Sequence, residues 1–555
     1  MGSPIERYAA LSYVWGGNLT LMLLNSNYAE LSDAGFSSYI ERIPRTIIGA
    51  FSVVRDLGIR YIWVDSLCII QDSRGDWDRE ARQMDAVYRN AILTVCAASA
   101  HSASDGIAGI EDMLRTEEEN CFPLSSFRVR TVAPVAEMIH ASPWDTRAWT
   151  FQERLLSRRC AIFTPNEIVW QCRAATWRES VEYPLDASMW TLDVIGTPFR
   201  DMNENPVRRY VSCVTTYSGR KLTYLSDKSA AFRGLESVLA RELDSGERLL
   251  FGLPSRYFDW AMLWEPREPG PQISSVGASP SWSWCGWDHE VEWRQSMLGG
   301  PLFDLHTWFK TRTWVTWFYA DGQGSDMGWS LVWNVSQEQP RRLSGPDRWE
   351  GYLPIDGENG DLMYGRTWGV IRKIFDGVFG AREVVEAELD VTEESKISLE
   401  WLRSPPARLA PCTDGLLGFR TFTGMFSLSR KSMSSSTFST LSRGLRRFGI
   451  VDRAGDWCGT IVLDELKWLS QVGALFEFAA ISCAKDFAMD ELDTWTYYIP
   501  QEREHADWYC FFAIMLKPMP GSPGIFERAG LAKIYGSAFA LGSFPNARWK
   551  EIVLC

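Results

Sequence analysis

The chain has three short segments whose side chains could bind or transform a charged ligand. The first is a glycine turn, Trp15-Gly16-Gly17, that follows a short apolar run. Backbone N–H groups in such a turn can approach a pyrophosphate. Ser12 and Tyr13 stand next to the turn and would share its role. The same turn also fits a purely structural need for glycine at positive φ.

The second and third segments carry acids, an arginine and a tryptophan. Asp65 ends an apolar run, where a carboxylate can face a ligand or cap the following turn. Arg147 could hold a phosphate or pair with a local acid. Trp149 could stack on a base or fill a core, and it lies four residues before Glu153, near one helix face. Glu153 could also complement a helix N-terminus or pair with Arg147 or Arg154.

These segments must be positioned by alternating strands and helices. The pattern predicts strands over residues 8–14, 61–64 and 91–96, and helices over 44–57 and from an N-cap at Asp76. Apolar strands separated by amphipathic helices indicate a parallel sheet covered on both faces. Ligands of such sheets bind outside the carboxyl ends of the strands. We therefore expect the glycine turn, the Asp65 segment and the loop after Cys96 to meet at one rim.

Three blocks, in order, carry a family resemblance. They are Tyr-Ala-Ala-Leu-Ser-Tyr-Val-Trp-Gly over residues 8–16, Ile-Trp-Val-Asp-Ser-Leu-Cys-Ile-Ile-Gln-Asp over 62–72 (followed by Met84 and Tyr-Arg-Asn-Ala over 88–91), and Arg-Ala-Trp-Thr-Phe-Gln-Glu over 147–153. Together they resemble the pattern of fungal heterokaryon-incompatibility (HET) domains. The resemblance implies a role in self/non-self recognition and programmed cell death, as in innate immunity.

The HET family is distantly similar to Toll/interleukin-receptor (TIR) domains, some of which cleave NAD. Those enzymes place a catalytic Glu four residues after a Trp, as Glu153 follows Trp149 here. The Cys that usually follows that Trp is replaced by Thr150, which puts the alignment in doubt at this position. The implied fold is an α/β amino-terminal domain with a mostly parallel sheet flanked by helices (TIR-like or flavodoxin-like). A mixed α+β carboxy-terminal region follows it.

The resemblance makes Glu153 the candidate catalytic residue, with NAD as a possible substrate and no cofactor required. One carboxylate can stabilise the oxocarbenium-like transition state, since nicotinamide is already a cationic leaving group. The candidate ligand-binding residues are Ser12, Tyr13, Trp15, Gly16, Asp65, Arg147 and Trp149.

Two other functions stay open. A non-enzymatic domain could signal by self-association or by binding a protein partner. An unrelated hydrolase would use Cys68 or Ser66 as its nucleophile, with His101 or His140 as the base.

The chain of 555 residues is too long for one core, since single cores stop growing at about 250–300 residues. We predict a HET domain over residues 6–185 and a region of unassigned function over 186–555. That region contains a flexible Ser-rich insertion near 427–447. It also contains Pro-Ser-Trp-Ser-Trp over 280–284, which resembles a segment often found downstream of HET domains. The first strand begins so close to Met1 that an upstream piece could be missing.

The composition argues against a nucleic-acid-binding protein, a metal site and a membrane span. The formal net charge of −13 argues against a nucleic-acid partner. The 12 Cys form no C-x-x-C pair and only 5 His are present, so no metal site is expected. No run reaches the roughly 20 apolar residues of a membrane span, and the thiols indicate a cytoplasmic protein. The 27 Trp predict extensive aromatic packing.

Overall fold

The computed structural model describes residues 6–17, 21–116, 121–124, 127–130, 135–172, 176–180, 206–243, 248–273, 279–294, 308–309, 312–321, 328–333, 401, 404–407, 415–430, 441–487, 510–540 and 548–555. The chain divides into two compact units. Unit 1 comprises Met1–Arg209 and Arg220–Leu239, and unit 2 comprises Tyr210–Gly219 and Ala240–Cys555. The predicted domain boundary at residue 185 lies outside the described residues and stays a prediction.

Unit 1 is built on a six-stranded, mostly parallel sheet, as expected for an α/β domain. Its strands, in spatial order, are β2 (Tyr61–Trp63), β1 (Tyr8–Ser12), β3 (Leu93–Cys96), β6 (Arg159–Phe163), β7 (Ile168–Cys172) and β8 (Thr176–Arg178). The first four are parallel, whereas β7 and β8 add antiparallel strands at one edge.

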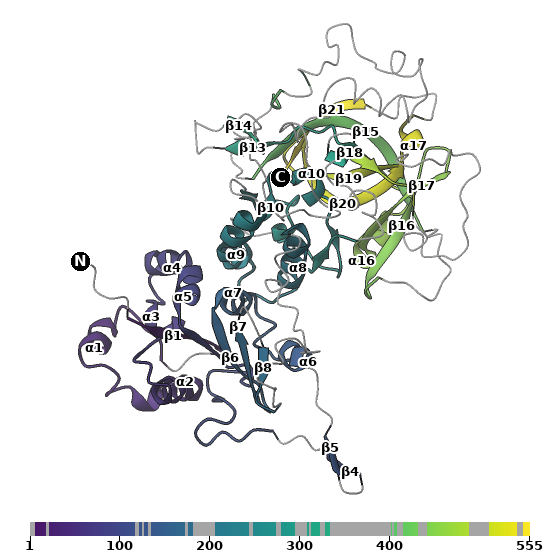
Figure 1. The fold of residues 1–555 in the computed structure, drawn as a ribbon. Helices are drawn as coiled ribbons and strands as arrows, with labels where there is room; N and C mark the ends of the chain where they lie inside the picture. The colour runs from purple at the N-terminus through teal and green to yellow at the C-terminus, as the bar shows by residue number, and fades with distance from the viewer. Residues whose placement is uncertain are drawn as a thin grey trace, which may run out of the picture. The chain divides into compact units, whose positions relative to one another are not determined.

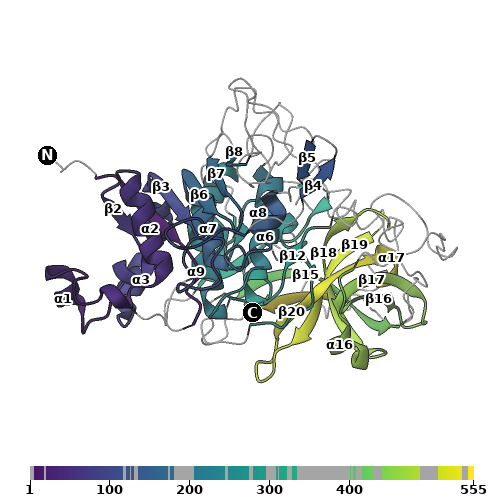
Figure 2. The ribbon, with the colours of Figure 1, turned by 90° about the horizontal axis from the view of Figure 1, so that it is seen from below.

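Helices cover both faces of this sheet. Figure 1 shows α2 (Arg45–Asp56) on one side and α5 (Met84–Asn90) and α7 (Ala148–Leu156) on the other, and Figure 2 views α2 from below. α2 follows Pro44, and Gly58 lies just after it with φ +70°, which confirms the predicted helix over 44–57. The other elements as far as residue 243 are α1 (Tyr28–Asp33), η1 (Ile40–Arg42), α3 (Asp65–Cys68), α4 (Arg74–Ala81), β4 (Cys121–Leu124), β5 (Phe127–Arg130), α6 (Val135–His140), α8 (Pro206–Ser218), η2 (Leu225–Asp227) and α9 (Lys228–Leu243).

The alternation of side chains along β1 decides which residues can meet which helix. Leu11 and Tyr13 belong to the core cluster that contains Ile47 of α2. Val14 belongs to the cluster on the other face, with Trp144. Because successive side chains of a strand point to opposite faces, Ser12 lies on the Val14 face, toward α7.

One predicted helix start was wrong. Ser73, and not Asp76, caps α4, and its side chain accepts a hydrogen bond from the Asp76 N–H. The Asp76 carboxylate instead accepts from the backbone N–H of Ile70 at 2.9 Å. An acid in the first helical turn is favoured there by the helix dipole.

Unit 2 is dominated by an antiparallel sheet that closes on itself. β15 (Leu417–Ser429), β16 (Leu445–Val451), β17 (Trp457–Asp464), β20 (Ile525–Tyr535), β19 (Cys510–Pro518) and β18 (Leu475–Ala484) pair in this order, and β18 pairs back with β15. Closure leaves the ring of strands without a free edge. Further elements are β9 (Leu249–Leu250), β10 (Leu253–Pro254), α10 (Phe258–Ala261), β11 (Glu265–Pro266), η3 (Trp284–Gly286), β12 (Val291–Glu292), β13 (Phe318–Asp321), β14 (Gly328–Leu331), α16 (Glu465–Trp468), η6 (Leu469–Gln471), α17 (Gly536–Ala540) and β21 (Arg548–Leu554).

The predicted aromatic packing is found mainly in unit 2. Trp260, Trp282, Trp284, Trp308 and Trp314 are all fully buried. The predicted Ser-rich insertion near 427–447 begins inside β15 and ends inside β16, and residues 431–440 lie outside the described residues. No helix in the described ranges is long and apolar enough to cross a membrane.

The glycine turn provides a test of the fold at the rim of unit 1. Gly16 has φ +76°, and a Cβ placed on it would lie 2.5 Å from Ser102 Cβ. The left-handed conformation alone costs a non-glycine residue roughly 1–2 kcal/mol. We expect Gly16→Ala to destabilise the full-length protein by at least that amount in urea unfolding.

Gly17→Ala is the matched control, because a Cβ at Gly17 would meet nothing within 4 Å. It should change the free energy of unfolding by less than about 0.5 kcal/mol. Equal stability of the two variants would contradict this account of the turn.

Candidate functional site

Three chain segments meet at the carboxyl ends of the parallel strands of unit 1. Ser12 is the last residue of β1, and Asp65 opens α3 shortly after β2 ends. Glu153 lies on α7, which packs beside β1. The chain passes from β1 to β2 on one side and then returns to β3 on the other, so β1 and β3 flank a topological switch point. Open α/β sheets bind ligands in the crevice at such a point.

Glu153 is held in a buried hydrogen-bond chain. The Ser12 hydroxyl donates to its carboxylate Oε2. The Ser12 Oγ in turn accepts from the indole Nε1 of Trp144 at 2.7 Å. Glu153 is only 5% exposed and Ser12 is fully buried. Glu153 on α7 and Ser12 at the end of β1 are therefore joined by a hydrogen bond that is buried inside unit 1.

Burial sets the ionisation of Glu153. The pKa of Glu153 is raised to about 7: desolvation is the largest cause and the Asp65 charge adds to it, whereas the hydrogen bond from Ser12, the charge of Arg147 and the Tyr88 hydroxyl oppose the rise. Among the described residues, Glu153 makes no ion pair. The predicted pairing with Arg154 is not formed, because Arg154 instead donates to Gln171 at 3.0 Å and contacts Asp145.

Asp65 lies at the same carboxyl-end edge of the sheet, as the first residue of α3. Its carboxylate accepts from the Trp15 Nε1 at 2.8 Å and from the Ser66 backbone N–H at 2.7 Å. Burial raises the Asp65 pKa, and these two hydrogen bonds oppose that rise. The side chain thus ties the glycine turn to the start of α3, whereas the N-cap position of that helix is Val64 and no side chain caps it.

Tyr13 and Arg147 complete the link between the segments. The Tyr13 hydroxyl donates to Ser66 Oγ at 2.8 Å, and Arg147 donates to the Tyr13 carbonyl at 2.9 Å. Burial, with the Asp65 charge as the next cause, raises the Tyr13 pKa far above its usual range, so the phenol stays neutral. The Arg147 charge therefore acts on both Asp65 and Glu153, and among the described residues Arg147 forms no ion pair with either acid.

Most of the predicted site residues come together. Contacts join Ser12 to Glu153, Trp15 to Asp65, and Arg147 to Tyr13. Gly16 adjoins them in the turn. The expected meeting of the glycine turn with the Asp65 segment and the loop after Cys96 is seen, since Trp15 bonds Asp65 and its carbonyl accepts the Ala103 N–H at 3.2 Å. The role of each site residue stays a prediction.

Trp149 is the exception. Its ring packs edge-to-face on Trp77, with ring centroids 6.3 Å apart. The four-residue spacing placed it near Glu153 along the helix, but this contact belongs to the packing of α7 against α4. The structure gives Trp149 no hydrogen bond to the other predicted site residues.

Sequence reasoning missed two residues, Tyr88 and Trp144. The Tyr88 hydroxyl donates to the Leu11 carbonyl at 3.1 Å, and it lies close enough to Glu153 to oppose the rise in the Glu153 pKa. Tyr88 stands in the second of the three blocks, which was a usable signal. Nothing local marks Trp144, because its role depends on a contact with Ser12, 132 positions away in sequence.

The start of α7 is anchored by Asp145. Its carboxylate contacts Arg220 at 2.9 Å, His140 Nδ1 at 2.6 Å and Arg154 at 3.4 Å. Although burial acts to raise it, the Asp145 pKa lies below its ordinary value because of the hydrogen bond with His140 and the charges of Arg220 and Arg154. Arg147 occupies the N-cap position of α7, and its side chain makes no cap hydrogen bond. Glu153 lies in the second turn of α7, beyond the first-turn position considered for it.

The alternative nucleophiles lack a base among the described residues. Ser66 Oγ accepts from Tyr13, and Cys68 contacts the Val64 N–H at 3.4 Å. Burial raises the pKa of the Cys68 thiol, which disfavours the thiolate. His140 is bound to Asp145, and no described contact joins His101 to either nucleophile. Within the described ranges, no cluster of three or more His, Cys, Asp or Glu could hold a metal ion.

Comparison with known proteins identifies the amino-terminal part of the chain. Residues 8–153 match the family described as "Heterokaryon incompatibility protein (HET)". The matched segment runs from the first residue of β1 to Glu153. No curated protein and no solved structure matches the chain. The chain therefore carries a heterokaryon-incompatibility domain, which suggests a function related to incompatibility and cell death.

The buried acid predicts an unusual dependence of stability on pH. A folded-state pKa raised from 4.5 to about 7 gives stability that is present at low pH. That stability is lost as pH rises through about 7, because the unfolded state ionises first. The loss amounts to about 3 kcal/mol.

We expect the difference in free energy of unfolding between Glu153→Gln and the wild type to grow in favour of the variant by up to that amount from pH 4.5 to 8. Urea unfolding of the full-length proteins measures it. Glu137→Gln, at an exposed position on α6, should show a constant difference from the wild type. A flat difference for Glu153→Gln would mean that Glu153 is ordinarily solvated.

Proposed function

We propose that the HET domain is a cell-death effector that hydrolyses the nicotinamide–ribose bond of NAD, with Glu153 as its catalytic carboxylate. One observation carries the proposal: a buried acid that forms no ion pair among the described residues lies at the switch point of a parallel sheet. A strongly perturbed acid at a ligand-binding position of a fold is a functional-site candidate.

The reaction needs negative charge more than it needs acid catalysis. The C–N bond breaks with its electron pair going to nicotinamide, which leaves neutral, while positive charge develops on the ribose. Ionised Glu153 would stabilise that charge. Water then forms the new C–O bond and releases a proton. An acid whose pKa is about 7 is partly ionised at neutral pH and can also accept that proton.

The neighbouring groups suit the rest of a dinucleotide. Arg147 uses one N–H to bind the Tyr13 carbonyl, and the structure gives its guanidinium no other hydrogen bond among the described residues. A guanidinium has five N–H donors, so the others suit a phosphate. Asp65 supplies a second negative charge near Glu153. The Trp15 ring and the Gly16 turn border the same rim.

Strand order supports the proposed likeness to TIR and flavodoxin folds. Strands β2-β1-β3-β6 run parallel in an order that begins as doubly wound sheets of the flavodoxin type do. The antiparallel β7 and β8 depart from that pattern at the far edge, away from the proposed site.

The direct test is NAD consumption by full-length protein at high concentration. Removing a catalytic carboxylate should lower the rate at least about 100-fold, so Glu153→Gln should lose almost all activity, whereas Glu137→Gln should keep it. Circular dichroism of each variant checks folding. Equal NAD loss by wild type and Glu153→Gln would exclude Glu153 as the catalyst.

The pH profile gives a second test. If ionised Glu153 is required, the rate should rise with pH around 7. Because the Asp65 charge raises the Glu153 pKa, Asp65→Asn should move this rise to lower pH. The measurement is kcat/KM for NAD between pH 5 and 9. If the pH at which kcat/KM rises is unchanged in Asp65→Asn, or moves higher, the Asp65 charge does not act on the catalytic group.

A non-enzymatic domain that self-associates or binds a protein partner is the second candidate. The 5% exposure of Glu153 favours it, because an acid so buried can hold α7 against β1 without contacting any ligand. Absence of NAD loss in a folded wild-type protein, together with concentration-dependent association in sedimentation, would support this function over catalysis.

A further inference from the structure

The Pro-Ser-Trp-Ser-Trp segment of unit 2 orients two other tryptophans. The Trp264 Nε1 donates to the Trp282 carbonyl at 3.2 Å, and the Trp287 Nε1 donates to the Ser281 carbonyl at 2.8 Å. The Ser281 hydroxyl accepts the backbone N–H of Arg528 at 2.9 Å, which ties the segment to β20. With both indole N–H groups engaged, the two rings are held in place.

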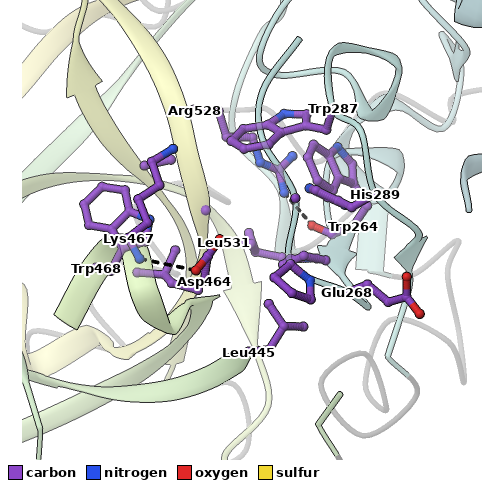
Figure 3. A pocket seen from close by; sticks show the side chains of 16 residues that line it. Trp264, Glu268, Trp287, His289, Leu445, Asp464, Lys467, Trp468, Arg528 and Leu531 are labelled. Atoms are coloured by element: carbon purple, nitrogen blue, oxygen red, sulfur yellow. Dashed lines mark hydrogen bonds between the residues drawn. The ribbon is translucent and has the colours of Figure 1, made fainter. Parts of the chain in front are cut away.

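These rings line a pocket against the closed sheet (Figure 3). We call it the tryptophan pocket and define it by Trp264, Trp287, His289, Lys467, Trp468 and Arg528. Lys467 and Trp468, from α16, face the other aromatic side chains across the opening. The pocket is open to solvent, and its cavity volume is about 30 Å³. Small-molecule sites are concave and mostly apolar, with few polar groups.

Two cations lie among the rings. The Arg528 guanidinium is 3.8 Å from the Trp264 ring centroid, and its side chain is 1% exposed. The Lys467 Nζ is 5.8 Å from the Trp287 ring and 5.9 Å from the Trp468 ring. Both distances to the Lys467 ammonium fall within the range of cation–π attraction.

Neither cation has a carboxylate partner among the described residues. Arg528 donates to the carbonyls of Met262, at 2.9 Å, and Trp264. Burial lowers the Arg528 pKa to about 9, and it also lowers the Lys467 pKa. Arg528 is buried and feels the nearby Glu265 charge, whereas Lys467 is exposed and feels the charges of Asp464 and Glu527 opposed by that of Lys517. An anion beside either cation would add a further favourable charge interaction.

The acids of the pocket do not fill that role. Asp464 caps α16 by accepting the Lys467 backbone N–H at 3.3 Å. Glu268 is exposed on the loop that follows β11. The positive charge of Lys467 therefore lies at the opening beside the Trp287 and Trp468 rings.

We propose that the tryptophan pocket binds a planar aromatic molecule that carries one anionic group. The indole rings provide surfaces on which a flat ring can pack. The Lys467 ammonium provides a charge-assisted hydrogen bond, and the buried Arg528 adds positive potential behind it. The proposal concerns unit 2 alone and does not depend on the reaction proposed for the HET domain.

The test compares three probes on the full-length protein by isothermal titration calorimetry at pH 7. 2-Naphthoate has both the ring and the charge, 2-naphthamide has the ring only, and acetate has the charge only. We expect 2-naphthoate to bind at least about tenfold more tightly than either of the others, since a charge-assisted hydrogen bond contributes about that factor.

Charge variants locate the binding site. Lys467→Met should abolish the preference for 2-naphthoate over 2-naphthamide, and Lys467→Arg should keep it. Lys517→Met is the control, because Lys517 is nearby but already pairs with Glu527 at 2.5 Å. It should leave the preference unchanged. No binding of 2-naphthoate, equal affinity for the two naphthyl probes, or a preference that survives in Lys467→Met would overturn the proposal.

Discussion

The hydrogen bond between Ser12 and Glu153 is the interaction on which the proposed site depends. It joins the end of the central strand β1 to the middle of α7 and places an acid where water is excluded. An ionised carboxylate in such surroundings is costly unless it is paired or well hydrogen-bonded. Here the donor is the Ser12 hydroxyl, and the charge of Arg147 opposes the effect of the Asp65 charge on the Glu153 pKa. A pKa raised to about 7 lets the acid change protonation state near neutral pH, as catalytic acids often do.

The surroundings of this bond are held by other constraints at the same rim. Asp145 gathers two arginines and a histidine at the start of α7, so the helix cannot shift without breaking buried ion pairs. Gly16 allows the turn after β1 to pass against Ser102, and Asp65 ties that turn to the start of α3. The rim of unit 1 is thus preorganised from three sides, as a site that stabilises developing charge requires.

Unit 2 uses tryptophan in two ways. Trp282 and Trp284 are fully buried and contribute to the core, whereas the backbone around them orients Trp264 and Trp287 toward a pocket. One short segment therefore connects core packing with the shape of a possible ligand site. Its repeated Ser and Trp residues are explained by these contacts: Ser281 accepts a strand N–H, and Trp282 donates to Gly415 at 2.8 Å.

The sequence by itself determined the α/β character of unit 1, the bounds of α2 within a residue or two, and the family of residues 8–153, because periodicity, capping and block order are local properties. Because the carboxyl ends of parallel strands lie at one edge of a sheet, the sequence also predicted that the glycine turn and the Asp65 segment would lie close together. Only the tertiary structure decided that Glu153 is buried, that Trp144 and Tyr88 support it, and that Trp149 packs elsewhere. Ser12 and Glu153 are 141 positions apart, and no local pattern encodes which side chains meet over such a separation. The closure of the unit 2 sheet likewise depends on the pairing of β15 with β18, which strand propensity alone cannot specify.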